Sequence, residues 1–121
     1  TVEHQADILF NSISLKRPAE ILVNAVKDKA QQNADAVKLT KAYLAGDLKA
    51  LELIYAEQTD MTQDEKNILV NYRNNDWVNQ FKTLLPAKSC FVAVGCLHLV
   101  GESGLIKQLQ NAGYTVEAVR L

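Results

Sequence analysis

Histidine and cysteine are scarce in this chain, and it contains no long hydrophobic run. Only two of the 121 residues are histidines and two are cysteines. No apolar stretch approaches the roughly 20 residues of a membrane-spanning helix. The 13 basic and 14 acidic residues nearly cancel. These absences argue against a membrane span and against a strongly basic surface for nucleic acid or anionic lipid, and they leave few candidates for a site built on imidazole.

The two cysteines, Cys90 and Cys96, are too far apart in an extended chain to form a disulfide with each other. Six residues of strand separate their ends by about 20 Å, at roughly 3.3 Å per residue. Their spacing fits neither a C-x-x-C redox motif nor a zinc knuckle. We therefore expect two packing thiols, with a reactive Cys96 as the alternative.

Residues 1–86 carry helical patterns and predict a helical region. Apolar residues recur at helical spacing over residues 2–13. Pro18 suits the first turn of a second helix, because its missing N–H is not needed there. Beyond it the pattern weakens at residues 31–33 and recovers, which indicates one long helix or two with a soft break. Gly46 ends this pattern.

Two sequence signals predict the next helix starts. Asp47 is a favourable N-cap for a helix over residues 48–57. The segment Thr62-Gln-Asp-Glu65 is a capping box, in which the hydroxyl accepts from a backbone N–H and the glutamate returns to the cap. The helix that follows is expected to end at Pro86, which cannot continue it.

Residues 87–121 predict a β-α-β unit. Residues 90–94 are apolar on both faces, as in a central parallel strand. A short helical pattern covers residues 105–111, and residues 114–119 alternate as a second strand. Since two parallel strands alone are marginal, they are expected to belong to a larger sheet. The predicted fold class is therefore α-rich α/β, a helical region followed by a C-terminal β-α-β end, together one domain or a fragment of one.

The turn Gly95-Cys-Leu-His98 places an imidazole at the end of the first predicted strand, where α/β proteins tend to place their chemistry. His98 is either a structural histidine that fastens the turn or a functional group. As a functional group it would be a metal ligand or an acid/base group with a pKa near neutrality. The other histidine, His4, follows Glu3 and is expected to be exposed.

Four glycines surround this turn: Gly95, Gly101, Gly104 and Gly113. They match neither the dinucleotide-binding fingerprint nor a P-loop. We expect them to allow positive φ and close packing in a structural turn. The weaker alternative is that the N–H groups at Gly101 and Gly104 bind an anion at a helix start.

Three motifs together resemble the TraB/GumN family, which includes the Tiki-type proteases and belongs with the ChaN-like and erythromycin-esterase-like proteins. The motifs are Gly95-x-x-His98-Leu-x-Gly101-x-x-Gly104 with Gly113-Tyr-x-Val116, Tyr72-Arg73-Asn74-x-x-Trp77, and Tyr43-Leu-Ala-Gly46-Asp47. Members of the family carry two Gly-x-x-His motifs, and this chain carries one. The resemblance thus implies the C-terminal half of such a protein, completed by the missing N-terminal half or by a second copy of the chain.

The resemblance also implies a catalytic site with His98, Arg73 and Asn74, in a metal-dependent, peptidase-like hydrolase that is inactive as this piece alone. His98 would be a ligand of a divalent metal ion. Such an ion needs at least two further ligands, and within this chain only carboxylates such as Glu3 or Glu102 could help. We favour a solvated or helix-N-terminal role for Glu102. The family implies a periplasmic or cell-envelope location.

The residues near the turn have alternative interpretations. Arg73 is either a surface arginine paired with Asp76 or a residue whose guanidinium binds a carboxylate or oxyanion through two N–H groups. Asn74 would orient a neighbour by hydrogen bonds to the Gly95 turn or to Arg73, and Trp77 is expected in the core. The competing function is a non-catalytic helical interaction module, in which the turn around His98 is only structural.

Overall fold

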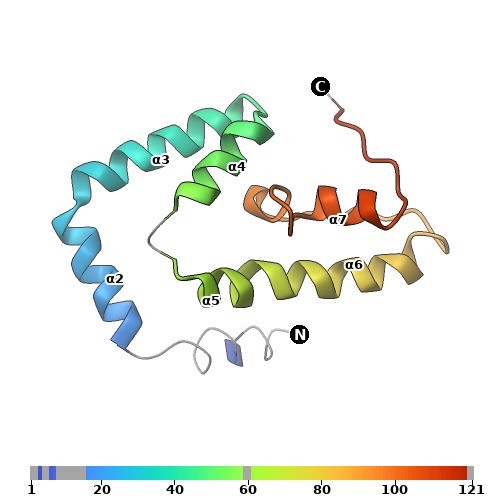
Figure 1. Cartoon of the computed structure of the whole chain (residues 1–121), viewed down its shortest axis with the longest axis horizontal. Coiled ribbons are helices and arrows are strands. Elements are labelled where there is room, and N and C mark those ends of the chain that lie inside the picture. Colours follow the sequence, from blue (N-terminus) through green and yellow to red (C-terminus); the bar gives the residue numbers. More distant parts are fainter. Residues whose placement is uncertain (1–2, 4–5, 8–15, 59–60, 120–121) are drawn as a thin grey trace.

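The computed structural model describes residues 3, 6–7, 16–58 and 61–119. The helix expected over residues 2–13 lies largely outside this part. The regular elements, in chain order, are α2 (Lys16–Lys27), α3 (Lys29–Leu44), α4 (Leu48–Glu57), α5 (Gln63–Lys66), the π-helical turn η1 (Asn67–Asn71), α6 (Tyr72–Leu84), the 3₁₀ turn η2 (Cys96–His98) and α7 (Leu105–Asn111). All of them are helical (Figure 1).

The helix starts confirm both capping predictions. Asp47 Oδ1 accepts a hydrogen bond of 3.0 Å from Ala50 N at the start of α4. Thr62 Oγ1 accepts from Glu65 N at 3.2 Å, and Thr62 N donates to Glu65 Oε2 at 2.8 Å, which is the complete capping box. Local side-chain chemistry alone therefore set these two boundaries.

Two boundaries differ from the sequence interpretation. The break between α2 and α3 falls at Asp28 rather than at the weak stretch of residues 31–33. The long helix after Thr62 contains a π-helical turn, in which Tyr72 N bonds to the carbonyl of Asn67. One extra residue in this turn changes the direction in which the residues of α6 point relative to α5. Neither feature has a strong sequence signal.

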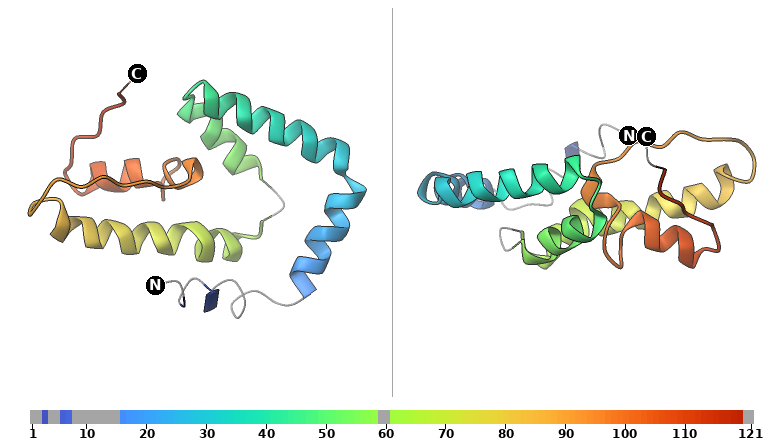
Figure 2. Two further views of the ribbon diagram at one scale, coloured as in Figure 1. Left: turned by 180° about the vertical axis from the view of Figure 1, so that it is seen from behind. Right: turned by 90° about the horizontal axis from the view of Figure 1, so that it is seen from above.

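The elements form two helical pairs, with α2 at the outer edge (Figures 1 and 2). Helix α3 packs against α4, and α6 packs against α7. The turn η2 contacts both α4 and η1, so it joins the two pairs. No helix within the described ranges is long and apolar enough to cross a bilayer.

The core is small and lies where η2 meets the first helical pair. Its buried centre consists of Ala42, Leu51 and Val100. Partly buried side chains from the same elements pack around it: Leu39, Ala50, Ile54, Tyr55, Cys96 and Leu99. The residues on either side of His98 are thus anchored in the core, which holds the turn in place.

The predicted α/β class is wrong for the described residues, because they contain no strand and no sheet. Residues 89–95 and 114–119 have no regular secondary structure and form no backbone ladder. Phe91, in the middle of the first segment, is 96 % exposed. An apolar or alternating pattern encodes an extended preference, whereas a strand also needs a neighbouring strand to receive its hydrogen bonds. Those neighbours are missing here, so the parallel β-α-β unit does not form.

Candidate functional site

The Gly95-x-x-His98 motif forms a tight turn directly after the irregular segment 89–94. His98 N donates to the carbonyl of Gly95 at 2.9 Å, and Cys96–His98 adopt a 3₁₀ conformation. Cys96 and Leu99 pack against the core on either side of the histidine. Both cysteines are free, as the sequence predicts, but only Cys96 is a packing thiol, because Cys90 is exposed. The turn therefore presents the His98 ring from a backbone that is fixed by packing and by hydrogen bonding.

Asn74, on α6, ties this turn to the helix. Its side chain is fully buried, at 0 % exposure. The amide Nδ2 donates to the carbonyl of His98 at 3.1 Å and to the carbonyl of Ser103 at 2.8 Å. The amide Oδ1 lies 2.7 Å from His98 Nδ1. Asn74 thus bonds to the turn that follows Gly95, as the sequence suggested.

These contacts determine which nitrogen of His98 carries the proton. The two carbonyls can only accept, so the NH₂ group of Asn74 must face them. The Oδ1 atom that faces His98 can only accept as well, so Nδ1 must carry a hydrogen. In the neutral imidazole the lone pair is therefore on Nε2. A lone pair on a fixed Nε2 is what a metal ligand or a general base requires.

Trp77 and Arg73 lie beside the imidazole on the same face of α6, four residues apart. The Trp77 and His98 ring centroids are 4.9 Å apart, with the planes inclined by 48°. The Arg73 guanidinium carbon lies 4.9 Å from the Trp77 ring centroid. Trp77 is partly buried against the His98 ring, and it does not belong to the cluster around Ala42, Leu51 and Val100.

The surroundings of His98 favour its neutral form. Burial lowers the pKa of His98 below its ordinary 6.5, and the positive charge of Arg73 lowers it further. Both causes act against the imidazolium, because one removes water and the other adds a like charge. At neutral pH the ring therefore has its Nε2 lone pair available.

A model of the TraB/PrgY/gumN family matches residues 1–118 of the chain. The chain belongs to the TraB/PrgY/gumN family. No match was found among curated proteins or among solved structures. The family resemblance seen in the sequence is thus confirmed, whereas the wider superfamily relations and the assignment to a C-terminal half stay predictions.

The four glycines around the His98 turn differ in what they do. Gly104 lies so close to the chain before it that an added Cβ would collide with the carbonyl oxygens of Leu99 and Val100. Gly101 has φ +81°, a conformation that other residues rarely adopt. These two glycines shape the loop whose Ser103 carbonyl bonds to Asn74. Gly95 has ordinary backbone angles, and a Cβ added there would lie 3.8 Å from His98 Cδ2, an ordinary contact. Gly113 has φ +89° after α7.

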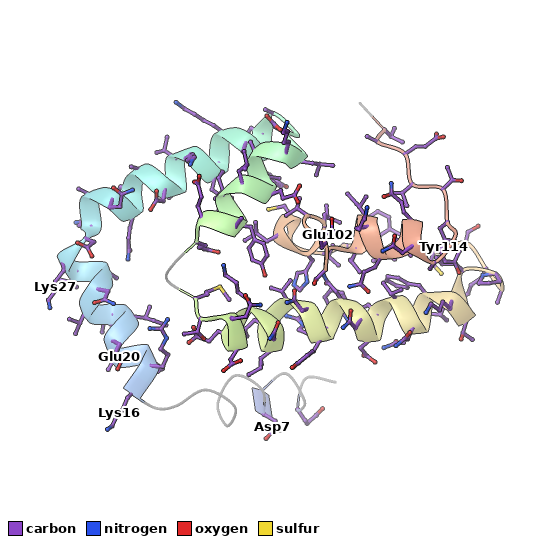
Figure 3. The ribbon with its side chains drawn as sticks, in the orientation of Figure 1. Asp7, Lys16, Glu20, Lys27, Glu102 and Tyr114 are labelled. Atoms are coloured by element: carbon purple, nitrogen blue, oxygen red, sulfur yellow. The ribbon has the colours of Figure 1, made fainter. Side chains whose placement is uncertain are left out.

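The described residues of this TraB/PrgY/gumN protein do not by themselves fit a metal ion. Among them there is no group of three or more His, Cys, Asp or Glu side chains that could hold one. Glu3 and Glu102, the carboxylates considered from the sequence, are both exposed, and Glu102 lies in the loop before α7 (Figure 3). His98 therefore supplies one nitrogen donor and not a complete ligand set.

Sequence reasoning missed two parts of the site. The Ser103 carbonyl acts through its backbone, which no residue type signals. The contact of Trp77 with His98 has a partial signal, since Arg73, Asn74 and Trp77 are spaced three and four residues apart and share a helix face. A buried asparagine in mid-helix is a further signal, because an amide there needs partners from elsewhere in the fold.

Proposed function

We propose that this protein works as part of a hydrolase of the TraB/PrgY/gumN family, with His98 Nε2 as the functional atom and peptides as the substrate class. The hydrogen bond of 2.7 Å between Asn74 Oδ1 and His98 Nδ1 carries this proposal. It fixes the ring and leaves Nε2 with a lone pair that can accept a proton from water or bind a metal.

The two roles of Nε2 differ in what else they need. As a general base, His98 removes a proton from an attacking water, and the depressed pKa keeps the ring unprotonated at neutral pH. As a metal ligand, it needs further ligands from outside the described residues, because these contain no complete set. In both cases we expect the 121-residue chain to be inactive by itself.

The tautomer can be measured without any assay of activity. With only two histidines, the imidazole signals of a ¹⁵N-labelled chain are readily assigned by comparing His98→Gln with His4→Gln. We expect His98 to carry its proton on Nδ1 at pH 7 and to titrate below pH 6.5. An Nε2-protonated ring, or a pKa at or above 6.5, would overturn the structural basis of the proposal.

The activity itself requires the protein purified from its native source. Hydrolysis of a pool of fluorogenic peptides should be lost in His98→Gln and retained in His4→Gln. Bound metal is measured in the same samples by elemental analysis. Loss of metal together with activity identifies a ligand, and loss of activity with metal unchanged, or with none present, identifies a base. If activity survives His98→Gln, the hydrolase proposal fails.

An interaction module is the second candidate function, and an exposed apolar helix supports it. Helix α2 has no buried residue, and its apolar face includes Leu22 at 65 % and Val26 at 73 % exposure. The chain exposes 9216 Å² of surface. A compact monomer of this mass exposes about 6,500 Å² by the usual size scaling. We propose that another polypeptide covers part of this surface, either more of the same protein or a second copy.

Light scattering during size-exclusion chromatography tests the second candidate. A dimer that dissociates in Val26→Glu supports a second copy as the cover. If the chain is a monomer and binds a separately supplied segment of the same protein in a stable complex, the cover is more of the same protein. A chain that stays monomeric under both conditions argues against the interaction module.

A further inference from the structure

Arg73 is oriented toward the site by contacts on two sides. Its Nη1 donates to the carbonyl of Leu69 at 3.3 Å, one turn back along the helix and within η1. Its guanidinium carbon lies 4.9 Å from the centre of the Trp77 ring. The side chain is therefore held across the helix surface beside the indole, where most of its N–H groups have no partner among the described residues.

This half-buried cation lacks the carboxylate partner that arginines usually have. Asp76, the expected partner three residues on, instead accepts a hydrogen bond of 2.9 Å from Gln80. No ion pair involves Arg73 in the described part of the chain, whereas Arg17 forms one with Glu65 at 2.6 Å. The prediction of a surface pair between Arg73 and Asp76 is thus wrong. A fixed guanidinium without a counter-charge is suited to an anion from outside.

We propose that Arg73 and Trp77 form a carboxylate-binding subsite beside His98, which holds a peptide through a free carboxylate. A guanidinium offers two parallel N–H groups, and these match the two oxygens of a carboxylate. The stacked indole holds the fork in one plane and provides an apolar wall for the ligand. One cation matches one negative charge, so a singly charged carboxylate fits better than a phosphate dianion.

This subsite deepens the proposed function and rests on it for the identity of the substrate. The Trp77 ring touches the His98 ring, so a carboxylate on Arg73 would bring the neighbouring part of a peptide within the same cluster of side chains as Nε2. The carboxylate can be the end of a peptide chain or an acidic side chain. Both sources share the same chemistry at Arg73, and two probes separate them.

Binding is measured by NMR titration of the 121-residue chain. Trp77 is the single tryptophan, so its indole N–H gives one unambiguous signal. Acetyl-dialanine, with a free terminal carboxylate, should shift this signal to saturation, whereas the corresponding amide should not. Acetyl-alanyl-glutamate amide tests the side-chain source. If neither carboxylate shifts the signal beyond the amide, or if inorganic phosphate binds equally well, the proposal is overturned.

Variants show whether the guanidinium is responsible. Arg73→Gln should remove the saturable shift, and Arg73→Lys should weaken binding roughly fivefold because a lysine loses the paired N–H groups. Lys82→Gln is the matched control, since it removes an exposed positive charge from the same helix. Unchanged amide spectra elsewhere establish that each variant is folded. Equal binding by Arg73→Gln and the unmodified chain contradicts the subsite.

Failure of the subsite and failure of the hydrolase proposal can be told apart. In the protein from its native source, Arg73→Gln should raise KM for acid-terminated peptides toward that for amidated ones. His98→Gln should remove hydrolysis of both. Carboxylate binding without any hydrolysis retains the subsite and overturns the function. Hydrolysis that depends on His98 but shows no preference for a carboxylate supports the hydrolase proposal and overturns the subsite.

Discussion

At the scale of single residues, Asn74 has the greatest effect on the candidate site. Its side chain bonds to the His98 ring, to the His98 backbone and to the loop at Ser103. An amide is suited to this position because it donates twice and accepts once in one plane. An aspartate of the same size could not donate to the two carbonyls.

Replacement of Asn74 should therefore be costly. We expect Asn74→Ala to lower the free energy of unfolding by about 2–4 kcal/mol, because three hydrogen bonds are lost and their partners are left unpaired. Its exposed neighbour provides the control, and Asn75→Ala should change the free energy by less than about 0.5 kcal/mol. Urea denaturation followed by circular dichroism measures both. Equal effects would mean that the Asn74 contacts contribute little to stability.

Tyr55 shows the opposite case, a buried polar atom without a partner. Its hydroxyl forms no hydrogen bond with any described residue, and burial raises the pKa of the phenol. Tyr55→Phe should therefore raise the free energy of unfolding by up to about 1 kcal/mol, since it removes an unsatisfied group. The Lys66 ammonium, 5.2 Å from the ring centroid, keeps its aromatic contact in the variant. A clear loss of stability would show that the hydroxyl has a partner in solution.

At the scale of elements, an ion pair connects α2 to the start of α5. Arg17 Nε and Nη2 donate to the two carboxylate oxygens of Glu65 at 2.6 and 3.1 Å. Glu65 is also the last residue of the capping box, so one carboxylate serves two elements. The Arg17 guanidinium, with help from Thr62 N–H, lowers the pKa of Glu65 to about 2.

This pair predicts a specific pH dependence of stability. The pKa of Glu65 falls from 4.5 to about 2 on folding, so its contribution is complete above pH 4.5 and is lost as the pH falls through 2. In Arg17→Gln, the free energy of unfolding should fall less steeply between pH 4.5 and pH 2 than in the unmodified chain. Glu20→Gln is the control, because Glu20 lies 3.7 Å from Arg17 and is largely exposed. Identical pH profiles for both variants would contradict the role of the pair.

At the scale of the whole molecule, the small core and the exposed α2 face should respond very differently to substitution. Leu51, at 2 % exposure, lies in the core, and Val26 on α2 is 73 % exposed. Leu51→Ala should lower the free energy of unfolding by about 3 kcal/mol. Val26→Ser should change it by less than about 0.5 kcal/mol in the isolated chain. A large loss in Val26→Ser, measured by urea denaturation, would show that α2 is already covered.

Much of the helical region was predictable because its signals are local. The caps at Asp47 and Thr62 need only the residues within one turn, and they were confirmed. The bond between Asn74 and the turn after Gly95 was also anticipated, although from a family resemblance rather than from spacing. The break at Asp28 and the π-helical turn at residues 67–71 were not anticipated, because no glycine or proline marks either of them and no side-chain cap forms there.

The sequence by itself determined the helix caps, the turn at Gly95-x-x-His98 and the membership in the TraB/PrgY/gumN family. Only the tertiary structure decided whether the two apolar segments became strands, and they did not, since a ladder needs neighbours that a local pattern cannot provide. It also decided the tautomer of His98 and the place of Trp77. Both depend on contacts across more than twenty residues of chain, and no periodicity encodes such contacts.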